Sequence, residues 1–161
     1  MRKYLFLTAG LAAAFASPVQ AADWYLVGQS DDDLFFADAG SVAKSGTYMQ
    51  VNVLDSMGEP IDDPAGDIYY LAGPIRLDCS GRKYQNLGNA ALGLDHSYLA
   101  DADVDSDWQA VNPGTHAEAI FDFACDAGFR DTPVTDPFAY ADEYWDYGTS
   151  DDAPAEGPVI S

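Results

Sequence analysis

Residues 112–125 read NPGTHAEAIFDFAC, and they predict a helix that begins after Gly114. Thr115 and Glu118 have the spacing of a capping box, in which each side chain accepts a hydrogen bond from the other residue's backbone amide. The apolar residues are three or four positions apart and share one helix face: Ala117, Ile120, Phe121, Ala124 and Cys125. We therefore expect a helix with one buried face, ending near Gly128.

The chain before this helix has the pattern of an antiparallel sheet. Aromatic, β-branched and alternating apolar residues indicate strands over residues 24–29, 34–37, 47–54, 68–79 and 82–87. Residues 58–66 and 88–107 are instead rich in Gly, Pro, Ala and Asp, so we expect mostly loops there. The simplest architecture is α+β, with a single antiparallel sheet and one C-terminal helix.

The N-terminus has the form of a secretory signal peptide. Arg2 and Lys3 precede an apolar run over residues 4–15, and Ala21 fits the position before a cleavage site. The run is too short to span a bilayer, which needs about 20 residues, and no lipid-anchor cysteine follows it. We expect residues 1–21 to be removed, leaving a periplasmic or extracellular protein that is not inserted in a membrane.

The chain has 2 cysteines, Cys79 and Cys125. An even number in an exported chain favours a disulfide, because the periplasm and the exterior are oxidising. Such a bond would tie the predicted helix to the strand that ends at Cys79. The other interpretation is a free thiol nucleophile with a neighbouring base, but nothing in the sequence places His96 or His116 beside a cysteine.

The composition is strongly acidic. The chain has 27 acidic and 7 basic residues, which give a formal net charge of −20. Proteins bind phosphate backbones and anionic lipid surfaces through Lys and Arg, so this charge argues against nucleic acid and membrane surfaces as partners. Cationic partners, metal ions or a solvated acidic surface are all compatible with it.

The character of the chain changes after Arg130. Residues 131–161 are acidic and Pro-containing, without Lys or Arg, which predicts a disordered tail after a domain over residues 22–130. The tail nevertheless contains an aromatic cluster: Phe138, Tyr140, Tyr144, Trp145 and Tyr147. Three interpretations stay open: a tail that folds back over its own domain, a short partner-binding segment, or a tail without a role.

Several segments share their order and spacing with a known family. Trp24 opens the predicted mature chain, and residues 36–42 form an aromatic-x-Asp-x-x-Ser-hydrophobic turn before a strand over residues 51–54. Residues 75–79 form a strand that leads to the first cysteine. Residues 108–115, WQAVNPGT, match a Trp-x-x-hydrophobic-x-Pro-Gly-Ser/Thr helix start. Together these segments resemble the surface-adhesin protein E family of exported bacterial proteins.

This resemblance implies an antiparallel sheet with a C-terminal helix fixed by a disulfide, which agrees with the residue patterns. Characterised members are similar to adhesins that bind the host matrix. The present chain departs from the adhesive type because it has few Lys or Arg and no lipid-anchor cysteine. No ligand-binding residue of the family can be matched to a position here.

Alternating aspartates form the best candidate metal site. Four carboxylates could converge on a calcium ion, which takes six to eight oxygen ligands: Asp101, Asp103, Asp105 and Asp107. The loop is not an EF-hand, because its sixth position is Ser106 instead of Gly and its twelfth is Asn112 instead of Glu. A solvated acidic loop is the alternative.

No catalytic constellation is evident. A Ser–His–Asp arrangement would need His96 or His116, and the chain has no Gly-x-Ser-x-Gly elbow. We expect His116, in the first helical turn, to face solvent. We therefore expect no enzyme and no cofactor.

The hypothesis is an exported binding module that recognises an envelope or extracellular protein through a sheet face or the aromatic tail. The alternative is a structural or weakly calcium-binding envelope protein that uses residues 101–107.

Overall fold

A computed structural model describes residues 23–126 and 132–147 of the chain. The predicted signal peptide, Gly128 and residues 148–161 lie outside the described residues. The elements, in chain order, are β1 (Trp24–Gln29), β2 (Asp33–Asp38), η1 (Ala39–Ser41), β3 (Ala43–Ser45), β4 (Tyr48–Ile61), β5 (Ile68–Asp78), β6 (Lys83–Asn86), β7 (Asn89–Leu92), β8 (Tyr98–Ala102), β9 (Gln109–Ala110), α1 (His116–Cys125), β10 (Thr132–Val134) and α2 (Pro137–Trp145).

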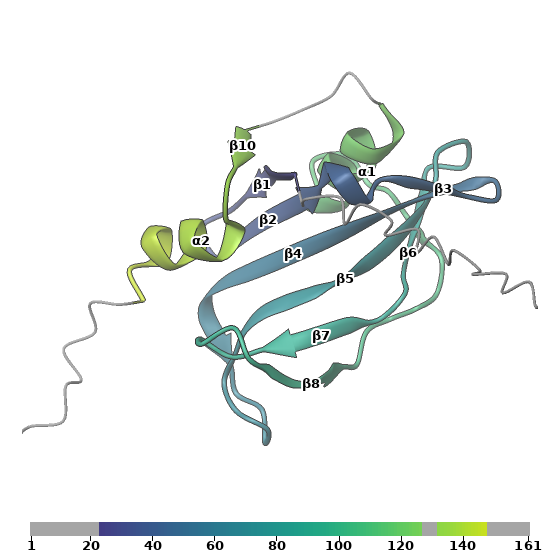
Figure 1. The fold of residues 1–161 in the computed structure, drawn as a ribbon. Coiled ribbons are helices and arrows are strands. Elements are labelled where there is room, and N and C mark those ends of the chain that lie inside the picture. Colours follow the sequence, from purple (N-terminus) through teal and green to yellow (C-terminus); the bar gives the residue numbers. More distant parts are fainter. Residues whose placement is uncertain (1–22, 127–131, 148–161) are drawn as a thin grey trace, which may run out of the picture.

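The described strands form one antiparallel sheet (Figure 1). Its main order is β10-β1-β2-β4-β5-β6-β9, with β3 paired to β4 and the β7–β8 hairpin paired to β5. The long strands β4 and β5 run through the centre, in a register that pairs Val51 with Ile75 and Asp55 with Leu71. Successive strand side chains point to opposite faces, so β4 presents Val53 and Asp55 to one face and Leu54 to the other.

The two helices cover opposite faces of this sheet. The helix α1 packs on a core that includes Val53 of β4 and Leu77 of β5. The helix α2 packs on a second core that includes Phe36, Leu54 and the fully buried Tyr70. Figure 1 shows α2 on the near side of the strands at one end, and α1 at the other end behind them.

The helix α1 begins and is anchored where its sequence predicts, except that Glu118 binds the amide of Gly114 instead of that of Thr115. The Thr115 hydroxyl accepts a hydrogen bond from the Glu118 amide, while the Glu118 carboxylate reaches back to the Gly114 amide at 2.8 Å. A disulfide joins Cys79, next to the end of β5, to Cys125, the last residue of α1, with their Cα atoms 5.7 Å apart. The predicted α+β fold, with a helix tied to the sheet by this disulfide, is therefore confirmed.

The expectation of a disordered tail is wrong for residues 132–147. The strand β10 pairs with β1, and α2 adds a second helix that the sequence analysis did not expect. Asp136 caps α2 by accepting hydrogen bonds from the amides of Phe138 and Ala139, and Pro137 fits the first helical turn. Burial of the aromatic side chains offsets the acidic composition, so this part of the tail folds back over its own domain.

Two predicted loops are also partly wrong. The strand β4 continues to Ile61, across an irregularity in its pairing with β5, and residues 89–102 contain the β7–β8 hairpin. Small residues suit β7 because Ala91 is fully buried there, against Leu71 and Leu99. Among the described residues, no helix has the length and apolar character that crossing a membrane requires.

Candidate functional site

A cleft with a volume of about 250 Å³ opens between α1 and the sheet, and we refer to it as the α1 cleft. Phe35 of β2, Val53 and Asp55 of β4 and Leu71 of β5 contribute to it from the sheet, and His116, Ala117 and Ile120 contribute from α1. Strands β6 and β7 add Tyr84, Asn86 and Asn89. Apolar side chains therefore surround a small set of polar groups, as in most ligand sites.

The strand register explains why the cleft forms at this position. Asp55 pairs with Phe35 on one side and with Leu71 on the other, so the three side chains lie in one row across the sheet. Leu71 belongs to a small core cluster with Met57 and Ile68, which contains no residue of α1. The cleft lies between this cluster and the larger core under α1.

Asp55 is the charged group of the α1 cleft. Its Oδ1 atom is enclosed and has no hydrogen-bond partner. Burial, and secondly the negative charge of Asp33, raise the pKa of the Asp55 carboxyl to about 7. An acidic group that is enclosed, unpartnered and strongly shifted in pKa is typical of a functional site rather than of a structural ion pair.

Asn89 supplies a second unsatisfied acceptor. Its Oδ1 atom is also enclosed without a hydrogen-bond partner. A Cβ atom on Gly73 would collide with this oxygen and with the carbonyl oxygen of Gly88, so only glycine lets β7 approach β5 this closely. The cleft thus contains two oxygen acceptors, one from β4 and one from β7, that the described protein leaves without donors.

His116 forms one wall of the cleft and is half-buried, so the expectation that it faces solvent is only partly right. The imidazole packs on the ring of Phe35 with 3.8 Å between the ring centroids. Gly28 provides the space, because a Cβ atom there would lie 3.1 Å from His116 Cδ2. The first turn of α1 therefore lies against β1 and β2 instead of projecting outward.

The other histidine contributes to a polar cluster on the opposite face of the sheet. The hydroxyl of the buried Tyr70 donates to Asp142 Oδ1, and His96 Nε2 lies 3.1 Å from Asp142 Oδ2. Burial, and then this hydrogen bond, raise the pKa of Tyr70, which keeps its hydroxyl protonated as a donor. Both oxygens of Asp142 are therefore engaged in holding α2 against the sheet.

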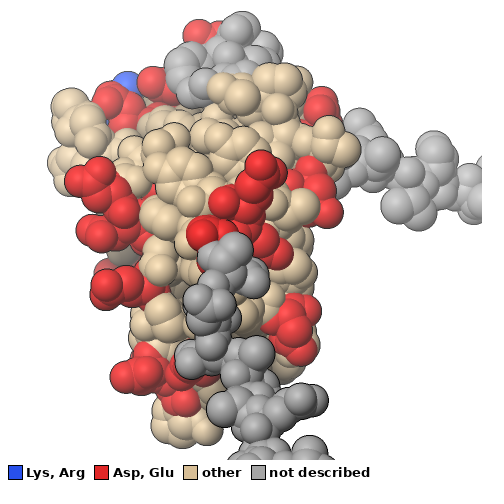
Figure 2. Space-filling view, turned by 90° about the vertical axis from the view of Figure 1, so that its left-hand side faces the viewer, with Lys and Arg blue, Asp and Glu red and all other residues tan. Residues whose placement is uncertain are grey.

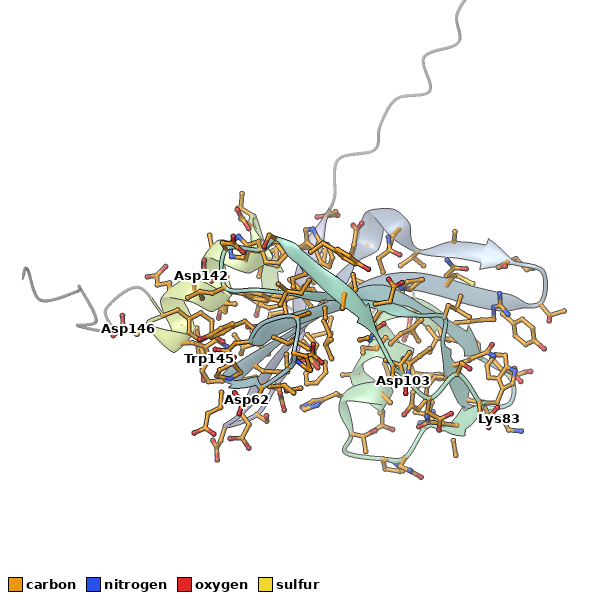
Figure 3. All side chains as sticks on the ribbon, turned by 90° about the horizontal axis from the view of Figure 1, so that it is seen from below. Asp62, Lys83, Asp103, Asp142, Trp145 and Asp146 are labelled. Atoms are coloured by element: carbon orange, nitrogen blue, oxygen red, sulfur yellow. A yellow bond between two sulfur atoms is a disulfide. The ribbon has the colours of Figure 1, made fainter. Side chains whose placement is uncertain are left out.

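The aromatic residues of the tail complete this attachment. Trp145 Nε1 donates to the Oγ of the fully buried Ser56 at 3.1 Å, and the Tyr147 hydroxyl donates to the carbonyl oxygen of Met57. Figure 3 shows Asp142 and Trp145 together at the α2 end of the molecule, with Lys83 at the opposite end. The contacts of Trp145 and Tyr147 are thus made within the domain.

The aspartates of residues 101–107 make separate local contacts. Asp101 accepts a hydrogen bond from the Tyr98 hydroxyl at 3.1 Å. Asp105 accepts one from the Asp107 amide at 2.9 Å and one from Gln109 Nε2 at 3.1 Å. In the part of the chain that the structure describes, no group of three or more His, Cys, Asp or Glu residues is placed to hold a metal ion.

Charge is distributed unevenly over the surface. Figure 2 views the α2 end and shows acidic side chains spread over that face, with basic side chains almost absent. The basic residues of the described segments are on β3, β5, β6 and the turn before β6: Lys44, Arg76, Arg82 and Lys83. None of them lines the α1 cleft, so no Lys or Arg side chain neutralises the negative charge of Asp55 there.

Asp55 and Asn89 are not among the site residues predicted from the sequence. A signal for Asp55 was present, because the alternation of Val51 and Val53 continues to this position and places it on the buried face of β4. No such signal existed for Asn89, since its approach to Gly73 depends on the pairing of β7 with β5.

Comparison with known proteins places the chain in a family. The model of the family described as surface-adhesin protein E matches residues 24–126, from the start of β1 to the residue that caps α1. No curated protein and no solved structure matches the chain significantly. The matched segment is more than half of the chain, so the protein belongs to the surface-adhesin protein E family and is an adhesin-like surface or exported protein.

Proposed function

We propose that this member of the surface-adhesin protein E family is a non-enzymatic exported module that binds a component of the envelope or of the extracellular space through its α1 cleft. The observation that carries the proposal is the pair of enclosed, unpartnered oxygens of Asp55 and Asn89 within an apolar cleft. Unsatisfied buried acceptors cost stability in the free protein, and a ligand that donates hydrogen bonds would remove this cost.

The state of the reactive side chains supports a binding role over catalysis. Both cysteines of the chain are joined in the disulfide. His96 and Asp142 contact each other under α2, and His116 is stacked on Phe35. The nucleophile and base that acyl transfer requires would have to come from other residues. The predicted signal peptide supports export.

The position of the tail favours the cleft over the aromatic segment as the contact surface. Trp145 and Tyr147 make hydrogen bonds within the domain, and Tyr140 packs edge-to-face on Phe36. A partner could use these side chains only by detaching α2 from the sheet. The α1 cleft is open without any rearrangement.

Site-specific photo-crosslinking of the full exported chain tests this proposal. A photoreactive residue replaces Ala117, at the α1 cleft, or the exposed Glu143 of α2 as the matched control. We expect the same envelope or extracellular component to be captured from position 117 and not from position 143. Capture from position 143 alone, or from neither position, would overturn the cleft as the contact surface.

A further inference from the structure

We propose that the α1 cleft binds a primary alkylammonium group, as carried by a lysine side chain or a free aliphatic amine, paired with the Asp55 carboxylate. This inference rests on the proposed function, because it names the chemistry that the same cleft recognises. A lysine side chain and a free aliphatic amine both carry a compact cation on a short apolar stem.

The hydrogen-bonding groups of the cleft determine the polarity of the ligand. The unsatisfied atoms, Asp55 Oδ1 and Asn89 Oδ1, are both acceptors. A ligand that offers only acceptors, such as a carboxylate or a phosphate, would leave both oxygens unpaired and would be repelled by Asp55. The terminal torsion of an aspartate has a broad minimum, so either carboxylate oxygen can turn toward a donor in the cleft.

The charge of the cleft determines the charge of the ligand. None of the residues that line it is Lys or Arg. An ionised carboxylate among apolar groups is costly unless it is paired, and no Lys or Arg side chain lines the cleft to pair with Asp55. A ligand cation would therefore gain more here than at the exposed aspartates of the surface, whose charges are solvated.

The oxygen atoms that the cleft offers to a cation favour an organic cation over a metal ion. Calcium takes six to eight oxygens, whereas the cleft presents one carboxylate among Phe35, Leu71 and Ile120. Residues 23–126 and 132–147 contain no group of three or more His, Cys, Asp or Glu residues that could hold a metal ion. These apolar walls instead match the methylene groups of an alkyl stem, which bury while the charged end finds its partner.

The volume and geometry favour an ammonium over a guanidinium. The cleft holds about 250 Å³, which is below the usual range of small-molecule sites, roughly 300–1,000 Å³, and suits one side chain. An ammonium is compact and carries three donors that rotate. It can therefore pair with the single carboxylate of Asp55 from several directions of approach, whereas a planar guanidinium is best matched by a carboxylate in bidentate geometry.

Binding should depend on pH in a defined direction. The titratable groups that face Asp55 are Asp33 of β2, Tyr84 of β6 and His116 of α1. Because burial and Asp33 raise the pKa of Asp55 to about 7, its carboxyl loses its charge as the pH falls below that value. An alkylammonium stays charged up to about pH 10. Its affinity should therefore be higher at about pH 8 than at about pH 6.

The test is an NMR titration of the full exported chain with n-butylammonium chloride, with n-butanol as the uncharged control. We expect shift changes at amides around Phe35, Asn89 and His116, stronger at about pH 8 than at about pH 6. Asp55→Asn should weaken binding by about tenfold or more. Glu143→Gln, which removes one exposed negative charge on α2, should leave the affinity unchanged.

Equal responses to n-butanol and n-butylammonium, or unchanged affinity in a folded Asp55→Asn variant, would overturn the inference. If capture from position 117 persists in either case, the proposed function stands without the ammonium chemistry. A parallel titration with Nα-acetyl-lysine N-methylamide separates the two sources. Binding at least as tight as that of n-butylammonium supports a lysine side chain of a partner protein, and binding of n-butylammonium alone supports a free amine.

Discussion

Each face of the sheet is covered by one helix, and the polar groups under the two helices differ in their hydrogen bonding. Under α2, Trp145, Tyr147 and Tyr70 all find hydrogen-bond partners, so the aromatic layer is closed. Under α1, Asp55 and Asn89 keep enclosed oxygens without partners beside an open cleft. The polar groups that attach α2 to the sheet are therefore hydrogen-bonded, whereas the α1 face keeps two oxygens without partners. Away from α2, the Nε atom of Arg76 on β5 is the third enclosed atom of the described residues without a partner.

The disulfide explains how the α1 face can stay incomplete. The bond at Cys125 and the cap at Thr115 fix the two ends of α1, so the helix does not depend on full contact with the sheet along its length. The helix α2 has no disulfide and is held by packing, by hydrogen bonds and by the contact of Asp142 with His96. A face that keeps unsatisfied polar groups at a cost in stability is where function is expected.

Removal of the disulfide should have the largest effect. The two cysteines are 46 residues apart, for which chain entropy predicts a loss of about 4 kcal/mol in the free energy of unfolding. The double variant Cys79→Ser/Cys125→Ser should therefore have a clearly lower Tm in thermal unfolding. Hydrogen exchange should accelerate in α1 before α2, and equal acceleration in both helices would contradict the comparison of the two faces.

Removal of the Trp145 side chain, which holds α2 on the sheet, should have the next largest effect on stability. Trp145→Ala removes a packed indole and leaves the buried Ser56 hydroxyl without its donor, for an expected loss of about 3 kcal/mol. The neighbouring Tyr144, with 42% of its surface exposed, is the control, as Tyr144→Phe, because this change keeps the ring that packs on Trp145 and removes only the exposed hydrogen bond from Gln29. Denaturant unfolding should show a loss below about 1 kcal/mol for Tyr144→Phe. Equal losses in the two variants would mean that α2 is not sealed by its inward aromatic residues.

Removal of the negative charge of Asp55 should stabilise the protein in one pH window. Because the folded pKa of Asp55 is raised from 3.8 to about 7, the native state binds more protons than the unfolded state between these values. The contribution of Asp55 to stability is thus greatest below about pH 4 and is lost as the pH rises to about 7.

The variant Asp55→Asn should therefore be more stable than the wild type at about pH 8, by on the order of 2 kcal/mol after allowance for partial exposure. Urea unfolding at several pH values measures this difference, which should shrink toward acidic pH. A gain that does not change with pH would show that Asp55 is not the titrating group.

Calcium should have the smallest effect. The carboxylates of Asp101 and Asp105 accept local hydrogen bonds, and those of residues 101–107 form no group placed to hold a metal ion, so millimolar calcium should leave the Tm unchanged. Differential scanning calorimetry with and without calcium measures this. A rise in Tm that disappears in Asp105→Asn would instead support the calcium-binding alternative.

Local patterns in the sequence predicted the sheet, α1 and the disulfide, because alternation, capping and cysteine pairing are local or compositional signals. The helix α2 was missed although Asp136 and Pro137 form a good helix start, because the acidic composition around them indicated disorder. Its stability comes from contacts with Tyr70 and Ser56, which are far away in sequence.

The α1 cleft could be predicted only in part, for a related reason. The alternation in β4 placed an acidic residue on a buried face, but whether Asp55 found a partner depended on β2, β5 and α1. The role of Asn89 required the approach of β7 to Gly73, which is a long-range contact. Unsatisfied groups are a property of tertiary packing and are not encoded in any one segment.

The titration of Asp55 tests the contrast between the two faces most directly. A side-chain carboxyl ¹³C NMR titration of the full exported chain, assigned with Asp55→Asn, measures this pKa in solution. An enclosed, unpartnered carboxylate in an open cleft predicts a pKa of about 7. A value near the ordinary 3.8 of an aspartate would mean that Asp55 is solvated or paired, and would contradict the account of the α1 face as the one left unsatisfied for a ligand.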